Sequence, residues 1–154
     1  MSTTAVLKDS PGTTVQLATF LLGDLMLGID IACIREITRV GDIAPVPDAA
    51  SSVRGIANLR GEVVTVLDLR TILELDPQDQ TSQSRLIILR YHDEHVGLLV
   101  DQVTDVLTVG PETEESLPAN ISGMDSRFFT TVYKLDLELL VLLNVTAVLE
   151  PAVS

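Results

Sequence analysis

The sequence has no tryptophan, two tyrosines and three phenylalanines among its 154 residues. Proteins that recognise bases or sugars stack them on such rings, so this shortage disfavours nucleic-acid and carbohydrate binding. The single cysteine, Cys33, excludes an intrachain disulfide framework, and its apolar neighbours predict a buried thiol. Basic residues are few, ten against 22 acidic ones, and the net charge of −12 repels phosphate backbones and anionic headgroups. We therefore expect no nucleic acid among the partners.

Long apolar runs are also missing. The longest near the C-terminus, residues 139–143, has the length of a strand and falls far short of the ~18 residues of a membrane helix. The opening residues are small and polar around a lone Lys8, and they lack the pattern of an export signal. We expect a flexible tail over residues 1–14, a cytoplasmic location and no direct membrane insertion.

What the sequence does contain is a series of short aliphatic runs separated by turn residues, which predicts a mainly β fold. A short helical turn or an irregular entry into a strand is expected near 31–37. Short helices are expected over 69–75 and 144–149, the last stopped by Pro151, and a long acidic loop is expected over 110–126. The predicted strands are 15–22, 25–29, 56–59, 63–67, 86–89, 96–100, 103–109, 130–135 and 139–143. So many short strands favour closed or nearly closed barrels, since closure removes exposed edges. Two related barrel-like subdomains within residues 15–150 fit the chain length.

The residues available for catalysis are few. His92 and His95 are the only imidazoles, and both fall in a predicted hairpin turn, where their spacing does not reliably bring metal ligands together. A solvated charged turn is the better interpretation. The acidic stretch 112–115 lacks the alternating ligands of a calcium loop, and no phosphate-binding or nucleophile motif is present. We expect no enzyme, no cofactor and no metal site.

Two features invite a functional interpretation. Arg60 follows Asn58 and Leu59 in a predicted turn between two apolar strands, with no partner inside the turn. It could pin the turn through nearby carbonyls or bind a carboxylate of another protein, and the sequence favours neither. The second feature is the segment 96–107, which is apolar on both faces apart from Asp101 and Asp105 and reads as a core strand with a bend.

Three groups of motifs occur in order along nearly the whole chain, from about Val15 to Leu149. They are FLLG at 20–23, GIDI at 28–31 and IREI at 34–37; VRGIANLRGEVV at 53–64, closed by DLR at 68–70; and VGLLVD at 96–101 with DVL at 105–107. In this order and spacing they resemble the CheW-like family of bacterial chemotaxis coupling proteins. The resemblance implies two five-stranded SH3-like β-barrel subdomains that share a hydrophobic core, with a few short helices.

The resemblance also implies a non-enzymatic adaptor. Members of the family couple transmembrane chemoreceptors to a CheA-type histidine kinase in chemotaxis signal transduction. The expected partners are the regulatory domain of the kinase and the cytoplasmic tip of methyl-accepting chemoreceptors. The expected location is at receptor arrays on the inner face of the membrane.

The motifs that align with the family also suggest contact residues. By resemblance, the kinase side comprises Ile34, Gly55 and Arg60, and the receptor side comprises Ile31, Glu36, Val96 and Val103. An apolar groove with a charged flank suits a helical receptor tip. Each has a structural alternative: the four aliphatic residues suit an ordinary core, and Gly55 suits a close approach of two backbones. Glu36 is the strongest interface candidate, because a charge gains little from burial.

The sequence also departs from the family pattern, with Thr65 where proline is usual and with Thr131 and Asp136 near usual glycines. These departures leave open an adaptor of a type IV pilus or another chemosensory-like pathway, and a scaffolding barrel that has lost these partners. A small enzyme built on His92 and His95 is the weakest alternative.

Overall fold

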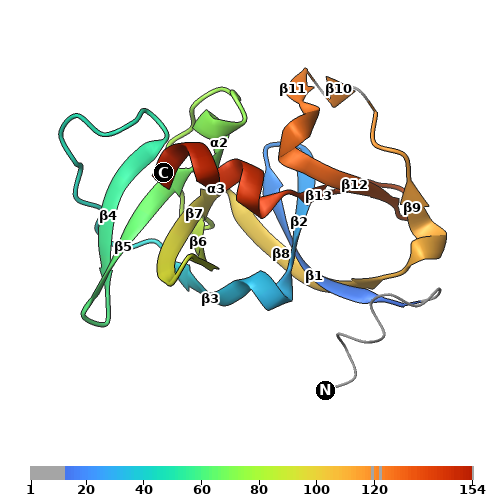
Figure 1. The fold of residues 1–154 in the computed structure, drawn as a ribbon, viewed down its shortest axis with the longest axis horizontal. Helices are drawn as coiled ribbons and strands as arrows, with labels where there is room; N and C mark the ends of the chain where they lie inside the picture. Colours follow the sequence, from blue (N-terminus) through green and yellow to red (C-terminus); the bar gives the residue numbers. More distant parts are fainter. Residues whose placement is uncertain (1–12, 119, 122, 154) are drawn as a thin grey trace.

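Two curved β-sheets lie side by side in this computed structural model, which describes residues 13–118, 120–121 and 123–153 (Figure 1). The six-stranded sheet has the order β8-β1-β2-β13-β12-β9, and the five-stranded sheet has the order β3-β6-β7-β5-β4. Strands of the first are β1 (Val15–Leu22), β2 (Leu25–Asp30), β8 (Gln102–Val109), β9 (Glu114–Glu115), β12 (Phe129–Lys134) and β13 (Leu139–Leu143). Strands of the second are β3 (Ile34–Arg39), β4 (Val53–Leu59), β5 (Glu62–Asp68), β6 (Arg85–Tyr91) and β7 (Glu94–Val100).

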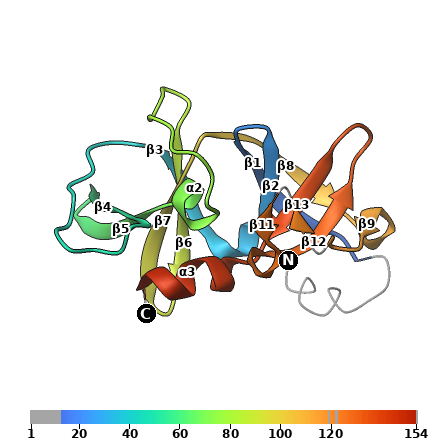
Figure 2. The ribbon, with the colours of Figure 1, turned by 90° about the horizontal axis from the view of Figure 1, so that it is seen from above.

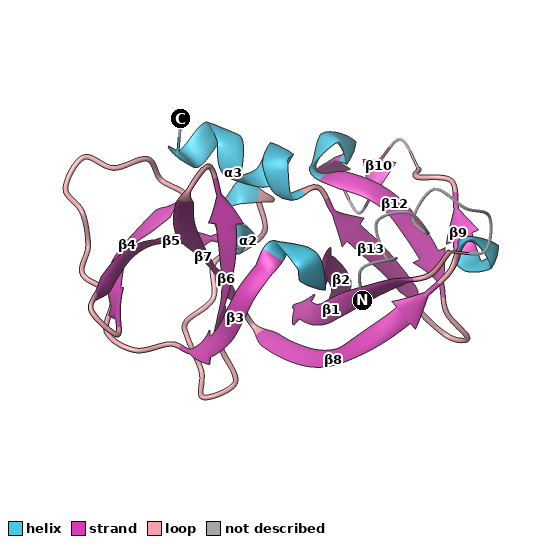
Figure 3. Cartoon of the chain, turned by 60° about the horizontal axis from the view of Figure 1, so that its bottom comes forward, coloured by secondary structure: helices cyan, strands magenta, loops and turns pink. Residues whose placement is uncertain are grey.

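Short elements join these strands. A separate hairpin pairs β10 (Asn120–Ile121) with β11 (Met124–Asp125). The helical segments, cyan in Figure 3, are η1 (Ile31–Cys33), α2 (Leu69–Ile72), η2 (Pro111–Thr113), η3 (Ser126–Phe128) and α3 (Val145–Val153). The five-stranded sheet is one continuous stretch of chain, whereas the six-stranded sheet combines β1 and β2 with strands from the second half. Figures 1 and 2 show α3 reaching back from the six-stranded sheet toward the five-stranded one.

The prediction of a mainly β fold with few short helices is confirmed, and each of the nine predicted strands is present with small shifts at its ends. The acidic loop over 110–126 was predicted wrongly as irregular, because η2, β9, β10, β11 and the start of η3 lie in it. Strand β9 pairs with β12 and adds a sixth strand to one sheet. The last helix also passes Pro151, since a proline removes one backbone donor without always ending a helix. The predicted flexible tail falls almost wholly on residues 1–12, outside the described residues.

The shared core lies between the two sheets and is built from strands that are buried on both faces. On β6, Ile87 and Leu89 face the shared core, whereas Leu86 and Ile88 face a second cluster inside the five-stranded sheet. This double burial explains why β6 and β7 read as nearly continuous apolar runs rather than as alternating ones. Gly97 on β7 is also tightly packed against β6, because a Cβ at this position would lie 3.2 Å from Cδ1 of Ile88.

The six-stranded sheet has its own inner cluster around Leu17, Val109, Tyr133 and Leu140. Its strands divide in the same way: on β13, Leu140 faces this inner cluster and Val141 faces the shared core. Helix α3 contributes Val148 and Leu149 to the shared core. In the described part of the chain, three mainly aliphatic clusters therefore hold the molecule together, and the central one draws on both sheets, as the family resemblance implied.

Gly55 has a specific structural role in the five-stranded sheet. Its φ is +152°, and an added Cβ would lie 2.3 Å from the carbonyl oxygen of Ala44. Ala44 forms two backbone hydrogen bonds of 2.8 Å with Ile56, so the segment before β4 is held against that strand at this point. Only glycine permits both this φ and this approach. The close backbone approach that the sequence left open for Gly55 is therefore present.

We predict that Gly55→Ala lowers the free energy of unfolding by about 2–4 kcal/mol, because the methyl group must displace the backbone of Ala44 and the φ is unfavourable. Gly41→Ala is the matched control, since a Cβ at Gly41 meets nothing within 4 Å, and it should change stability by less than about 0.5 kcal/mol. Urea unfolding of both variants measures the difference. Equal stability of the two variants would contradict the role assigned to Gly55.

Candidate functional site

A group of charged side chains lies where β3 approaches the tip of the β4–β5 hairpin. Arg60 in that tip forms an ion pair with Glu36 of β3. The Arg60 side chain is 73% exposed and that of Glu36 is 24% exposed. The hydrogen bond from Arg60 to Glu36 raises the pKa of the guanidinium further above its usual range. Arg60, which was expected on the kinase side, and Glu36, the best candidate on the receptor side, are thus direct partners.

A second ion-paired group stands beside this pair. Arg35 Nη1 donates to Glu62 at 2.6 Å, and Nδ1 of His95 lies 2.5 Å from the other carboxylate oxygen of Glu62. Arg35 and Glu36 are consecutive, and in a regular strand their side chains would point to opposite faces. The register between β3 and β6 shifts between Ile34 and Glu36, which marks a β-bulge at Arg35. Because a bulge changes the direction in which neighbouring side chains point, Arg35 and Glu36 can both reach the β4–β5 hairpin.

The β4–β5 turn does not depend on Arg60 for its shape. Arg60 and Gly61 have φ of 51° and 88°, as in the tight turns that match the twist of a hairpin. The amide of Gly61 donates to Oδ1 of Asn58 at 2.9 Å, so the asparagine side chain accepts the hydrogen bond that stabilises the turn. The suggestion that Arg60 pins the turn through carbonyls is not supported, since its guanidinium is directed at Glu36 of a different strand.

The histidines were expected together in a solvated turn, and this is right for only one of them. His92 occupies the β6–β7 turn with φ of 50°, whereas His95 lies in β7 and binds Glu62. Within the described residues there is no cluster of His, Cys, Asp or Glu that could hold a metal ion. Cys33 was expected to be buried and is half-buried, packed against the shared core.

The remaining candidates include Ile31 and Ile34, at the crossing from β2 to β3, and Val103, just after the crossing from β7 to β8. Ile31 in η1 is 38% exposed, and Ile34 and Val103 are half-buried against the shared core. Val96 is only 1% exposed and belongs to that core. Direct receptor contact by Val96 is therefore inconsistent with its burial, and the core role that the sequence left open fits it. Gly55 is likewise buried and can act only from beneath the surface.

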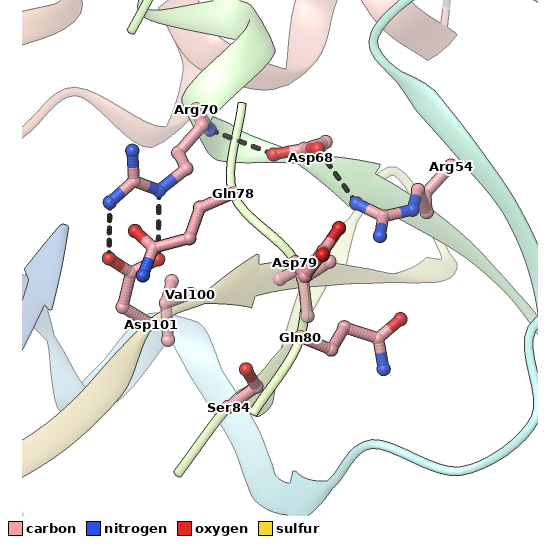
Figure 4. Close-up of a pocket in the computed structure, with 10 residues that line it drawn as sticks. Arg54, Asp68, Arg70, Gln78, Asp79, Gln80, Ser84, Val100 and Asp101 are labelled. Atoms are coloured by element: carbon pink, nitrogen blue, oxygen red, sulfur yellow. Dashed lines mark hydrogen bonds and ion pairs between the residues drawn. The ribbon is translucent and has the colours of Figure 1, made fainter. Parts of the chain in front are cut away.

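A small polar pocket opens beside α2, on the same sheet (Figure 4). Arg54 donates to Asp68 at 2.9 Å, and Arg70 makes two hydrogen bonds to Asp101, of 3.0 and 2.5 Å. Sequence reasoning had included Asp68, Arg70 and Asp101 in motifs without assigning them contacts.

No helix in the described part of the chain is long and apolar enough to span a bilayer.

Comparison with known proteins identifies the family. A family model described as "CheW-like domain" matches residues 16–152. The chain belongs to the CheW-like domain family. It is 31% identical to "Chemotaxis protein CheW" of Treponema pallidum over 134 residues, which are 84% of this chain and 79% of the relative. It is 30% identical to the protein of the same name from Bacillus subtilis, over 90% of this chain and 88% of the relative.

A solved structure of this family supports the architecture. The "scaffolding protein TtCheW" from Thermoanaerobacter tengcongensis superposes with a TM-score of 0.78 at 24% identity, and the match covers 88% of both chains. At this identity the likeness shows the CheW fold. The resemblance drawn from the sequence motifs is confirmed, and so is the predicted fold class.

Within this CheW-like fold, sequence reasoning missed Arg35, Glu62 and His95 as members of one charged group. Arg35 and Glu62 did lie inside the quoted motifs. Their only signal was charge next to apolar strand residues, and that signal does not name a partner. His95 follows a turn of mixed charge and was grouped with His92 instead.

We predict a specific acid response from Glu62. The hydrogen bond from His95 and that from Arg35 hold the pKa of this carboxyl below its ordinary value of about 4.3. A lowered folded-state pKa stabilises the fold above the ordinary value, and this stabilisation is lost as the pH falls through the lowered one. The stability difference between wild type and Glu62→Gln should therefore shrink as the pH falls from about 5 to below 4.

Urea unfolding from pH 7 to pH 3 measures this difference. Glu94→Gln is the matched control, because Glu94 makes no ion pair within the described residues and its substitution should have little effect at any pH. A Glu62→Gln difference that persists unchanged at pH 3 would contradict the assignment.

Proposed function

We propose that this protein is a non-enzymatic adaptor that couples chemoreceptors to a CheA-type histidine kinase. The observation that carries the proposal is the family match over residues 16–152, which spans both sheets and the shared core. Relatives that align over most of the chain are named chemotaxis proteins. The adaptor would act in the cytoplasm, at receptor arrays on the inner face of the membrane.

The kinase side of the proposal centres on the tip of the β4–β5 hairpin. Arg60 extends from the tip, and its guanidinium fork suits a carboxylate of a partner. Val63 in β5 is 63% exposed and supplies apolar surface close by in the chain. An exposed arginine beside apolar surface is typical of residues that contribute strongly to protein interfaces. Ile34 completes the kinase side, and Gly55 supports it from beneath.

The receptor side would use residues next to the two chain crossings between the sheets. Ile31 lies at the crossing from β2 to β3, Val103 lies just after the crossing from β7 to β8, and Glu36 on β3 provides the charge. A helical hairpin tip that docks by a few apolar anchors and one charged contact fits such a surface. Val96 supports this region from the core, and its substitution would act on docking indirectly.

The Glu36–Arg60 pair connects the two proposed surfaces. A partner that draws Arg60 toward its own carboxylate weakens the hold of Arg60 on Glu36, and a partner that binds Glu36 releases Arg60. Such a link would let binding at one surface change the affinity at the other, because coupling between sites is a difference in binding free energy.

We predict that the wild-type protein binds the isolated regulatory domain of a CheA-type kinase from the same genome, and that Arg60→Ala weakens this binding at least about tenfold. The variant should unfold at nearly the wild-type temperature, since Asn58 holds the turn. Arg127→Ala is the matched control: Arg127 is an exposed arginine paired with Asp125 at 3.2 Å, and its loss should leave kinase affinity unchanged.

Isothermal titration calorimetry at two salt concentrations measures these affinities. With a net charge of −12, binding should weaken as salt rises. Failure of folded wild-type protein to bind would overturn the proposed function. Equal affinities of wild type and Arg60→Ala would overturn only the role given to Arg60.

A further inference from the structure

The Arg70 side chain links α2 to Asp101, 31 residues further along the chain, and to the nearby residue Asp76. Its Nε and Nη2 atoms donate to the two carboxylate oxygens of Asp101, and Nη1 donates to the carbonyl oxygen of Asp76 at 2.7 Å. Its side chain is only 12% exposed. The two parallel bonds to Asp101 are drawn in Figure 4. Such a two-pronged arginine–carboxylate contact fixes orientation as well as distance.

Asp101 stands at the point where the chain leaves the five-stranded sheet. It follows the last residue of β7, Val100, and directly precedes β8 of the six-stranded sheet. The same carboxylate accepts a hydrogen bond of 2.8 Å from the amide of Gly23, in the β1–β2 turn. One carboxylate therefore joins a helix of one sheet to the crossing and to a turn of the other sheet.

The β1–β2 turn is shaped to receive this contact. Gly23 has a φ of 60°, and a Cβ there would lie 3.5 Å from Nη2 of Arg70, so the guanidinium packs directly against this glycine. The hydrogen bonds from Arg70 are the largest cause that lowers the pKa of Asp101, against a smaller opposing effect of burial. Within this group the arginine is thus the main stabiliser of the charged carboxylate.

The position of Asp101 bears on the candidate receptor surface. Gln102 and Val103, the next residues, pair with Leu21 and Phe20 and begin the edge strand of the six-stranded sheet. Val103 is one of the proposed receptor contacts and lies two residues beyond the ion pair. The proposed kinase contacts on β3 and on the β4–β5 tip have no hydrogen bond to Arg70 or Asp101 among the described residues.

Arg54 provides a natural comparison inside the same pocket. It too is a partly buried arginine paired with a carboxylate, Asp68, at 2.9 Å. Asp68 ends β5 and caps α2, so this contact stays within the five-stranded sheet. The two arginines differ in what they connect, since only the Arg70 contact reaches the β1–β2 turn and the start of β8.

We propose that Arg70 is a positioning residue for receptor binding: through Asp101 it fixes the start of β8 and the β1–β2 turn against α2. It acts without touching the receptor, by placing Val103. The inference rests on the proposed adaptor function and adds a residue to which the sequence motifs assigned no role.

The test measures two things on full-length wild type, Arg70→Gln, Arg70→Lys and Arg54→Gln. The first is the affinity for a soluble receptor fragment that contains the cytoplasmic helical tip, beside the affinity for the kinase regulatory domain. The second is hydrogen exchange of the backbone amides of Gly23, Gln102 and Val103. We expect Arg70→Gln to weaken receptor binding about tenfold, to change kinase binding less than about twofold and to speed exchange of the Gly23 amide.

Arg70→Lys should recover little, because a lysine cannot make the paired contact. Arg54→Gln should leave both the receptor affinity and the Gly23 amide unchanged. Equal losses of both affinities in Arg70→Gln would show a general structural role and overturn the proposal. Unchanged exchange at Gly23 and Gln102 in Arg70→Gln would overturn it even if wild type bound neither partner, and that lack of binding would by itself refute the adaptor function.

Discussion

The double burial of the central strands is the constraint on which the rest of this structure depends. Strand β6 turns Ile87 and Leu89 toward the core shared by both sheets and Leu86 and Ile88 toward the interior of its own sheet. A strand used on both faces offers no surface to a partner. It also ties the two sheets into one unit, because neither sheet can move without disturbing a closely packed interior.

Contact surfaces must then lie at edges, turns and crossings. Strand β3 is an edge strand and carries Arg35 and Glu36 next to its bulge, and β8 is an edge strand and begins with Gln102 and Val103. The hairpin tip that holds Arg60 lies beyond the buried strands. Charged residues at these places form ion pairs with one another: Arg60 pairs with Glu36, and Arg70 pairs with Asp101. An adaptor without a catalytic centre can therefore combine a rigid interior with a few exposed, electrostatically linked surfaces.

Much of this architecture was predictable from the sequence, because strands buried on two faces appear as short apolar runs between turns. Strand β9 was not, since it consists of two glutamates whose pairing with β12 is visible only in three dimensions. The same applies to burial: Val96 and Val103 look alike in sequence, yet the first lies in the core and the second at an edge. The motifs contained Glu36, Arg60, Arg70 and Asp101, but they did not indicate which of these charges pair, because the partners are 24 and 31 residues apart in the chain. Gly55 shows the same limit, because its neighbour Ala44 belongs to a preceding loop segment.

The central claim is that this protein bridges two partners at once, and a co-sedimentation experiment tests it most directly. Vesicles that carry a chemoreceptor are mixed with the CheA-type kinase, with and without this protein, and pelleted. The account predicts that the kinase pellets with the receptor far more when the protein is present, and that the protein itself pellets with both. If the amount of pelleted kinase is the same with and without folded protein, the account is wrong.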